Sequence, residues 1–182
     1  LAGCGTNTPG NNPGHTKTDS SVTSLTDNIT VTSVKTDITS FDQLKNGINE
    51  FSMNMYSALP ADENIFYSPY SIASALSMLD VGAGGTTKNE LENALGITDL
   101  DKWNDEMKAY LSKDWSQNTF VNTANSVWMN KGTTWAANIN SDFLTPAKDY
   151  YSGEIYEADF DGQADKVVQN VNNWVSDNTN KM

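Results

Sequence analysis

The 182-residue sequence predicts an α+β fold, in which several amphipathic helices are combined with a few short strands. Three features favour this class. A strand-helix-turn-helix block occupies residues 64–96, apolar residues recur at helical spacing on both sides of it, and two later segments are dense in β-branched and aromatic residues. With 37% hydrophobic and 10% aromatic residues, the chain is long enough to bury one substantial core.

The chain opens on a short processing signal. Leu1, Ala2, Gly3 and Cys4 match a bacterial lipobox, a signal that a peptidase cuts before the cysteine. We expect Cys4 to be the lipidated first residue of the mature protein, because a polar linker suited to a membrane anchor follows it. This predicts a protein that is extracellular or at the cell surface, anchored to a bacterial membrane. The alternative is a buried or free thiol left there by chance.

Residues 5–39 are rich in Thr, Ser and Asn and contain no aromatic residue. Such a segment buries too little apolar area to offset the entropy of ordering it, so we expect a disordered tether. The single cysteine and the single histidine, Cys4 and His15, precede the folded domain expected at 40–182. An intrachain disulfide is therefore impossible, and a Cys-His metal site or catalytic pair is not expected.

The chain is strongly acidic, with 11 basic and 23 acidic residues and a net charge of −12. This charge disfavours nucleic acid and anionic lipid as electrostatic partners. The simpler interpretation of the acidity is that it keeps a secreted protein soluble.

The folded domain is expected to begin with an amphipathic helix. A capping box at Ser40–Gln43 opens it, and Pro60 follows its end. The residues of its apolar stripe recur at helical spacing and should face the core: Leu44, Ile48, Phe51, Met55 and Leu59.

The block at 64–96 organises the rest of the domain. Ile65–Tyr67 have strand propensity, and Ser68 followed by Pro69 has the pattern of a helix N-cap and first helical residue. The helix runs through Leu79, and its many Ala and Ser residues suit close packing behind a sheet. Glycines end it, and a second capping box at Thr87–Glu90 opens a short helix. Because these glycines follow a helix, we exclude a Walker phosphate loop.

Apolar stripes predict three more helices, the second of them in spite of Pro146. Their residues are Leu100, Trp103, Met107 and Leu111, then Ile139, Phe143, Leu144 and Ala147, and finally Val167, Val168, Val171, Trp174 and Val175. Two strands are expected between them. Residues 120–130 predict a strand covered on both faces, and an alternating strand later places Tyr156, Ala158 and Phe160 on one face.

Acidic residues around 99–106 raise the question of a cation site. A calcium loop needs oxygen ligands at alternate positions, and Trp103 occupies one of these positions. A solvated helix face explains the acidic residues better, and no metal site is predicted.

Five blocks of this chain resemble serpins, the serine protease inhibitors, and they occur in the family's order with suitable spacing. The blocks are Asn64–Ile72 with Gly82–Thr87, Ala124–Trp128, Phe143 with Tyr150 and Tyr151, Ala158–Phe160, and Val171–Val175. The resemblance covers about Phe41 to the end. It identifies the chain as the N-terminal half of a serpin domain, of a bacterial lipoprotein type.

The resemblance implies a truncated serpin fold, with helices A to F, strands of the central sheet A and one barrel strand. It also implies a suicide-substrate inhibitor of an extracellular serine or cysteine protease, which is not an enzyme and needs no cofactor. In serpins the reactive loop lies near the C-terminus, so it is expected beyond Met182 and this fragment should not inhibit alone. The alternative function is a non-inhibitory, surface-tethered serpin-fold protein that binds a partner or serves as a scaffold.

The resemblance further implies five structural site residues and no catalytic residue. Ser68 and Ser71 match serines beneath the shutter, the place where the central strands part. Asn172 matches the asparagine of the covering helix, and Asn64 and Asn125 match asparagines of two strands. Small hydroxyls suit a shutter because they can bond the backbone in two sheet arrangements. The alternative for Ser68 is that it serves only as an N-cap.

Overall fold

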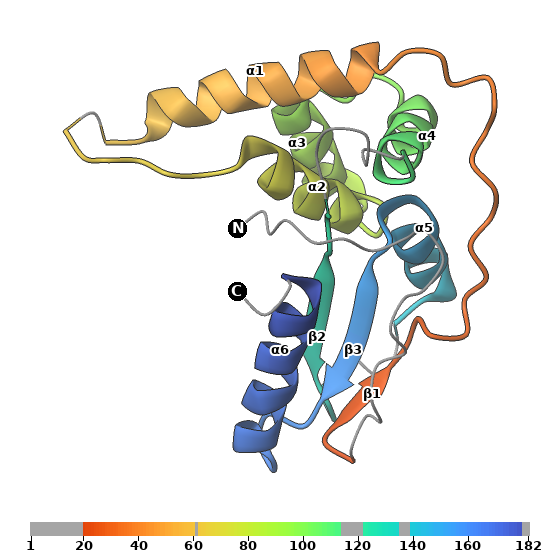
Figure 1. Ribbon diagram of the computed structural model, residues 1–182, viewed down its shortest axis with the longest axis vertical. Coiled ribbons are helices and arrows are strands. Elements are labelled where there is room, and N and C mark those ends of the chain that lie inside the picture. The colour runs from red at the N-terminus through yellow and green to blue at the C-terminus, as the bar shows by residue number, and fades with distance from the viewer. Residues whose placement is uncertain (1–19, 61, 114–121, 135–138, 180–182) are drawn as a thin grey trace.

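The computed structural model describes residues 20–60, 62–113, 122–134 and 139–179. Figure 1 shows a small sheet with one long helix against it and a group of helices at one end. The described elements are β1 (Val22–Ser24), α1 (Asp42–Ala58), α2 (Pro69–Asp80), α3 (Gly85–Leu95), α4 (Leu100–Leu111), β2 (Ser126–Asn130), α5 (Ser141–Tyr151), β3 (Glu154–Ala158) and α6 (Ala164–Asn178).

The sheet has the strand order β1-β3-β2. β2 and β3 are parallel, with Ser126 opposite Glu154 and Asn130 opposite Ala158. β1 joins the other edge of β3 in antiparallel orientation. α5 is the crossover between the two parallel strands, and α6 lies across the front of the sheet in Figure 1.

Two hydrophobic cores lie on opposite faces of this sheet. Ile155 of β3 and Met129 of β2 belong to the larger core, which they share with buried residues of α1 to α5. Tyr156 and Ala158 belong to the smaller core, together with Val167 of α6. Alternate residues of a strand point to opposite faces, so the five-residue strand β3 contributes side chains to both cores. The prediction that the strand in 120–130 is covered on both faces is confirmed for β2, since Trp128 packs against the smaller core.

The first predicted helix is confirmed as α1, but its capping box is wrong. The N-cap is Phe41, and it makes no side-chain capping bond. The backbone N–H of Leu44 instead donates to the carboxylate of Glu106 in α4, with an N to Oε2 distance of 2.8 Å. A free N–H in the first turn needs an acceptor, and here a buried side chain from another helix supplies it.

The central block forms α2 and α3. Ser68 caps α2 and Pro69 is its first residue, as predicted. The second capping box is wrong, because α3 begins earlier, at Gly85, with Gly84 as its N-cap. The predicted strand at Ile65–Tyr67 is also wrong, because no strand pairs with this segment in the described ranges.

The remaining elements follow the predicted order with shorter limits. α5 continues through Pro146, and α6 carries the expected stripe, although Val168 and Val175 are exposed. β3 ends at Ala158, so Phe160 lies beyond it and does not share its face. Residues 120 and 121 of the predicted strand lie outside the described residues, and β2 begins at Ser126.

Part of the expected tether is folded. Within 5–39 the structure describes residues 20–39, where β1 pairs with β3 and the side chains of Val22 and Thr26 are buried. The prediction of disorder is therefore wrong for this part. The apolar side chains of residues 20–39 are too few to form a core by themselves, but they pack against a sheet that the rest of the chain supplies. Cys4 and the rest of residues 1–19 lie outside the described residues.

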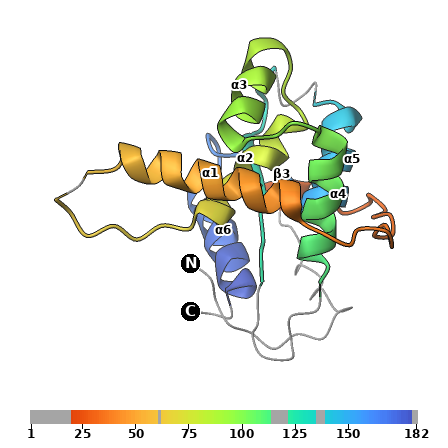
Figure 2. The same ribbon diagram turned by 90° about the horizontal axis from the view of Figure 1, so that it is seen from above.

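A close helix contact sets how α1 crosses the helices beneath it. An added Cβ at Gly47 would lie 2.5 Å from the carbonyl oxygen of Leu95 and 2.7 Å from Cζ3 of Trp103. Gly96 ends α3 with a φ of 68° and meets the same point of α1. Figure 2 shows α1 crossing the other helices, with its C-terminal end projecting beyond them. The missing side chain at Gly47 permits this approach.

We expect the substitution Gly47→Ala to lower the free energy of unfolding by about 1–3 kcal/mol, because the added methyl group overlaps backbone and a buried ring. Gly84→Ala is the control, since a Cβ there meets nothing within 4 Å, and its effect should stay below about 1 kcal/mol. Urea denaturation of both variants checks the difference. Equal stability of the two variants would contradict the close contact.

Candidate functional site

The buried side of α2 carries a row of hydroxyl groups. Ser74 and Ser77 are fully buried, one helical turn apart. The Ser77 hydroxyl donates to the carbonyl of Ala73 at 2.7 Å and accepts from Nε1 of Trp103 at 3.0 Å. The Ser74 hydroxyl accepts from Nδ2 of Asn125 at 2.9 Å. These bonds join α2 to α4 and to the segment that enters β2.

A second polar contact lies beside this row. The Tyr151 hydroxyl at the end of α5 donates to Oδ1 of Asn104 in α4, and both residues are buried. Burial raises the pKa of Tyr151, which keeps its hydroxyl protonated and able to donate. We call the six residues of these contacts the buried polar cluster: Ser74, Ser77, Trp103, Asn104, Asn125 and Tyr151.

One buried carboxylate lies at the end of α2. Asp80 is fully buried, and among the described residues its side-chain oxygens have no hydrogen-bond partner. Lys88 of α3 forms an ion pair with it at 3.5 Å. Burial raises the pKa of Asp80, and the nearby Lys88 opposes this effect. Asp80 therefore depends on Lys88 for compensation of its charge.

α6 is held on the sheet by aromatic residues that share one carboxylate. Nε1 of Trp174 and the hydroxyl of Tyr156 each donate to Oε2 of Glu154 at 2.5 Å. The ring of Trp128 stacks on Tyr156 with centroids 4.3 Å apart. Trp174 thus bonds α6 to β3, and the stacked rings of Trp128 and Tyr156 join β2 to β3.

The structure brings two of the predicted site residues together at the start of α2. The Ser68 hydroxyl accepts from the backbone N–H of Ser71 at 3.3 Å and from the Ser71 hydroxyl at 2.9 Å. Both residues are exposed. The first bond is the N-cap that the sequence predicted, whereas a role in sheet opening stays a prediction.

The other predicted site residues lie apart from this pair. Asn125 is buried and contacts Ser74 rather than Ser68 or Ser71. Asn64 is exposed in the loop after α1, and Asn172 is exposed on α6. Cys4 lies outside the described residues. The geometry therefore connects Asn125 to α2 through a serine that the motif did not single out.

The described part of the chain offers little for catalysis. Its ranges contain neither the cysteine nor the histidine, and no group of three or more His, Cys, Asp or Glu residues in them could hold a metal ion. A hollow of about 440 Å³ opens between the ends of α4 and α6, lined among others by Tyr110, Lys148, Glu154 and Trp174. Neither histidine nor cysteine is among the described residues that line it.

Sequence reasoning missed most of the buried polar cluster. The sequence pattern indicates Ser74 and Ser77 only as small residues suited to close packing, and Trp103 only as part of an apolar stripe. The available signal was their spacing: serines three residues apart on an otherwise apolar helix face place two hydroxyls in the core, where they need partners.

We expect Ser77→Ala to lower the free energy of unfolding by about 1–3 kcal/mol, because the indole N–H of Trp103 loses its acceptor in the core. Ser57→Ala in α1 is a matched control. Ser57 makes the same bond to the carbonyl four residues earlier, at 2.8 Å, but is exposed. Its effect should stay within about 0.5 kcal/mol. Denaturation followed by tryptophan fluorescence measures both, and a Ser77→Ala effect no larger than the control would contradict the assignment.

Comparison with known proteins places this arrangement in a family. Residues 46–182 match the family model described as serpin (serine protease inhibitor). Neuroserpin of Gallus gallus is 36% identical over 145 residues, which cover 74% of this chain and 33% of the relative. An uncharacterized serpin-like protein of Thermococcus kodakarensis is 31% identical over 155 residues, or 78% of this chain and 35% of the relative. The chain thus spans about a third of the length of these curated relatives.

Solved structures agree on the fold. A loop C-sheet serpin polymer matches with a TM-score of 0.65 and 29% identity, over 85% of this chain and 40% of that one. The thermophilic serpin tengpin in the latent state matches with a TM-score of 0.65 and 28% identity, over 84% and 39% of the two chains. The predicted α+β fold, the N-terminal part of the serpin fold, is confirmed. This chain belongs to the serpin family, whose members are in general protease inhibitors rather than enzymes.

Proposed function

We propose that the intact protein inhibits an extracellular serine or cysteine protease as a suicide substrate. The observation that carries this proposal is the family match over residues 46–182, together with the agreement of the described helices and strands with solved serpins. The family is described as one of serine protease inhibitors. Since the chain spans about a third of its relatives, the proposal concerns the protein to which this chain belongs.

The proposed mechanism uses strain release. A target protease cleaves an exposed loop, forms an acyl-enzyme ester with it, and is trapped when the loop inserts as a strand into the central sheet. This chain would supply the first parallel strands and the helix in front of them. Insertion requires that strands part beneath a covering helix, so the contacts of Trp174 and Tyr156 with Glu154 would have to yield or move with the sheet.

We assign the shutter role to Ser68, Ser71, Asn64, Asn125 and Asn172 as part of this proposal. Two observations support it. The Ser68 and Ser71 hydroxyls bond each other and remain exposed, so they are free to exchange partners. Asn125 bonds Ser74 directly before β2, so a change in strand position would act on α2.

We expect the intact protein to form an SDS-stable, 1:1 covalent adduct with at least one protease in a panel of secreted serine and cysteine proteases, because the acyl-enzyme ester is trapped before hydrolysis. The 182-residue chain alone is the matched control and should form no adduct. Gel electrophoresis and mass spectrometry check both. Cleavage by every protease without adduct formation would favour the alternative, a non-inhibitory serpin-fold binding or scaffold protein.

We further propose that Cys4 carries a lipid anchor that holds the protein on the outer side of a bacterial membrane. The supporting observation is the lipobox pattern at Leu1–Cys4, directly before a polar segment. Within the described residues, no helix is long and apolar enough to cross a membrane.

We expect the full-length precursor to fractionate with membranes and the variant Cys4→Ser to fractionate with the soluble proteins, because serine cannot receive the thioether-linked lipid. Labelling with a fatty acid analogue provides the chemical readout. Ser20→Ala, within the same polar segment, is the control and should stay with the membranes. Membrane association of Cys4→Ser would contradict the anchor.

A further inference from the structure

The segment at 21–35 is folded onto the domain although it precedes the residues that match the family model. The match begins at residue 46. We call residues 21–35 the strap. Figure 1 shows it running from β1 at the edge of the sheet past α5 toward the start of α1. Its contacts involve three elements of the family region: β3, α4 and α5.

The first part of the strap occupies the outer edge of β3. Leu25 N–H donates to the carbonyl of Ile155 at 2.8 Å, and Asp159 N–H donates to the carbonyl of Ser21 at 2.8 Å. The backbone N–H of Ile155 donates to the hydroxyl of Thr26 at 3.2 Å. The backbone N–H and C=O groups of this edge thus have partners within the chain. An uncovered edge strand would offer the same groups to strands of other molecules.

The second part of the strap completes a buried ion pair between two helices. Lys108 of α4 and Asp149 of α5 are 2.8 Å apart, with side chains 7% and 9% exposed. Thr32 gives Asp149 two more bonds, from its backbone N–H at 2.6 Å and from its hydroxyl at 2.8 Å. The same hydroxyl accepts from Nζ of Lys108 at 2.5 Å. We call Thr32, Lys108 and Asp149 the lock.

Charge and burial explain why the ion pair of Lys108 and Asp149 depends on Thr32 of the strap. Burial disfavours the charged form of Asp149, but the bonds from Lys108 and Thr32 outweigh this and hold its pKa below the ordinary value. A buried ion pair is favourable only when its remaining lone pairs and protons are also satisfied. Without Thr32, Asp149 would lose two of the three bonds described above. The strap and the α4–α5 pair therefore stabilise each other.

An exposed ion pair continues these contacts but contributes less. Lys35 lies 2.6 Å from Asp105 of α4, with its side chain 62% exposed. Such pairs on the surface contribute little to stability. The bonds of Thr32 to the buried pair Lys108–Asp149 and the short β1 ladder are therefore the contacts that hold the strap in place.

We propose that the strap is a locked edge strand: it closes the outer edge of β3 against strand addition, and Thr32 between α4 and α5 keeps it closed. β1 is only three residues long, so its ladder alone gives few bonds and the lock decides whether it stays. A released strap fits the vacated edge of a second copy in the same register. Release therefore leads to exchange of straps between two copies, a low-cost route to dimers.

Hydrogen exchange of the intact protein separates the two edges of β3. The amides of Ile155 and Asp159 bond the strap, whereas the amide of Glu154 bonds Asn125 on the opposite side, at 2.9 Å. In Thr32→Val we expect exchange of Ile155 and Asp159 to become about tenfold faster or more, since bonds to charged groups are lost. The rate at Glu154 should not change.

Ser33→Val is the matched control, because Ser33 is the exposed neighbour of Thr32 on the strap. It should leave all three rates unchanged. In solution, Thr32→Val should also show a concentration-dependent dimer by light scattering, and Ser33→Val should not exceed the parent chain. Unchanged rates at Ile155 and Asp159, or equal acceleration at Glu154, would overturn the lock. Faster exchange without dimers would overturn the strap exchange.

A cross-strand disulfide provides the rescue. Thr23 and Glu157 are partners in the β1–β3 register, and opposed residues of adjacent strands lie within the Cα separation that a disulfide spans. In a Cys4→Ser background, Thr23→Cys with Glu157→Cys should restore slow exchange and the monomer to Thr32→Val when oxidised. Failure of the oxidised chain to do so would also overturn the proposal.

Discussion

The double-sided burial of β3 is the constraint on which the rest of the structure depends. This five-residue strand has β2 on one edge and the strap on the other, with helices over one face and α6 over the other. Ile155 has to be apolar for the larger core, and Tyr156 and Ala158 for the smaller one. A shift of one residue in register would exchange the two faces, so that each set of side chains would meet the wrong core. The register of β3 therefore fixes where α5 and α6 can pack.

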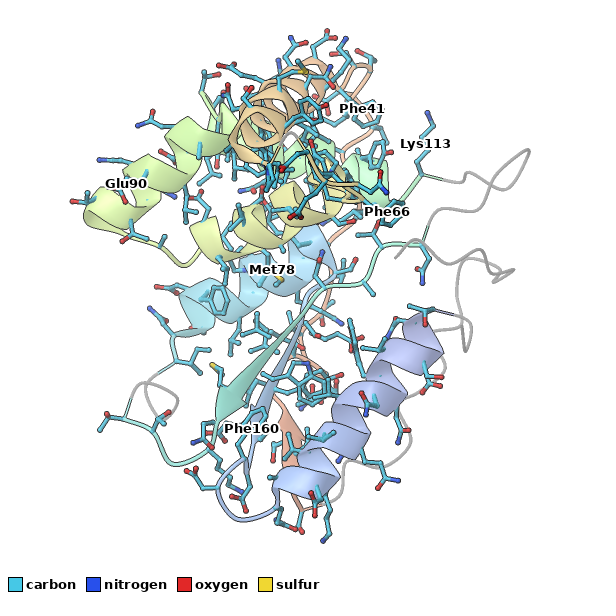
Figure 3. The ribbon with its side chains drawn as sticks, turned by 90° about the vertical axis from the view of Figure 1, so that its left-hand side faces the viewer. Phe41, Phe66, Met78, Glu90, Lys113 and Phe160 are labelled. Atoms are coloured by element: carbon cyan, nitrogen blue, oxygen red, sulfur yellow. The ribbon has the colours of Figure 1, made fainter. Side chains whose placement is uncertain are left out.

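Polar groups in the interior make this packing specific. Apolar contacts are not directional, so helices that meet only through them could slide past one another. Figure 3 shows Met78, a flexible apolar residue, between α2 and α5. The bonds of Ser77 with Trp103 and of Glu106 with the Leu44 amide, in contrast, each permit one arrangement of the helices. A displaced helix would leave these groups buried without partners, which costs more than the bonds contribute when formed.

The sequence predicted most helices and the family, because these depend on local patterns. The periodicity of the apolar stripes, the Ser68-Pro69 start and the order of motif blocks can all be read along the chain. What it could not predict depends on partners distant in sequence. Glu106 replaced the capping box expected at Ser40, and Ile65–Tyr67 found no partner strand among the described residues despite its propensity. Propensity indicates what a segment can form, whereas pairing decides what it does form.

The strap shows that partners distant in sequence also decide where the folded domain begins. Composition predicts that residues 5–39 do not fold, because their apolar side chains are too few for a core of their own. The strap folds because it supplies hydrogen-bond partners that Asp149 and the edge of β3 need. Thr32 donates to Asp149, and Thr26 accepts from the backbone N–H of Ile155. A carboxylate within the family region is thus completed by a residue from outside it. A substitution at either end of this contact changes the stability of the other, so the folded unit begins before the family match and includes the strap.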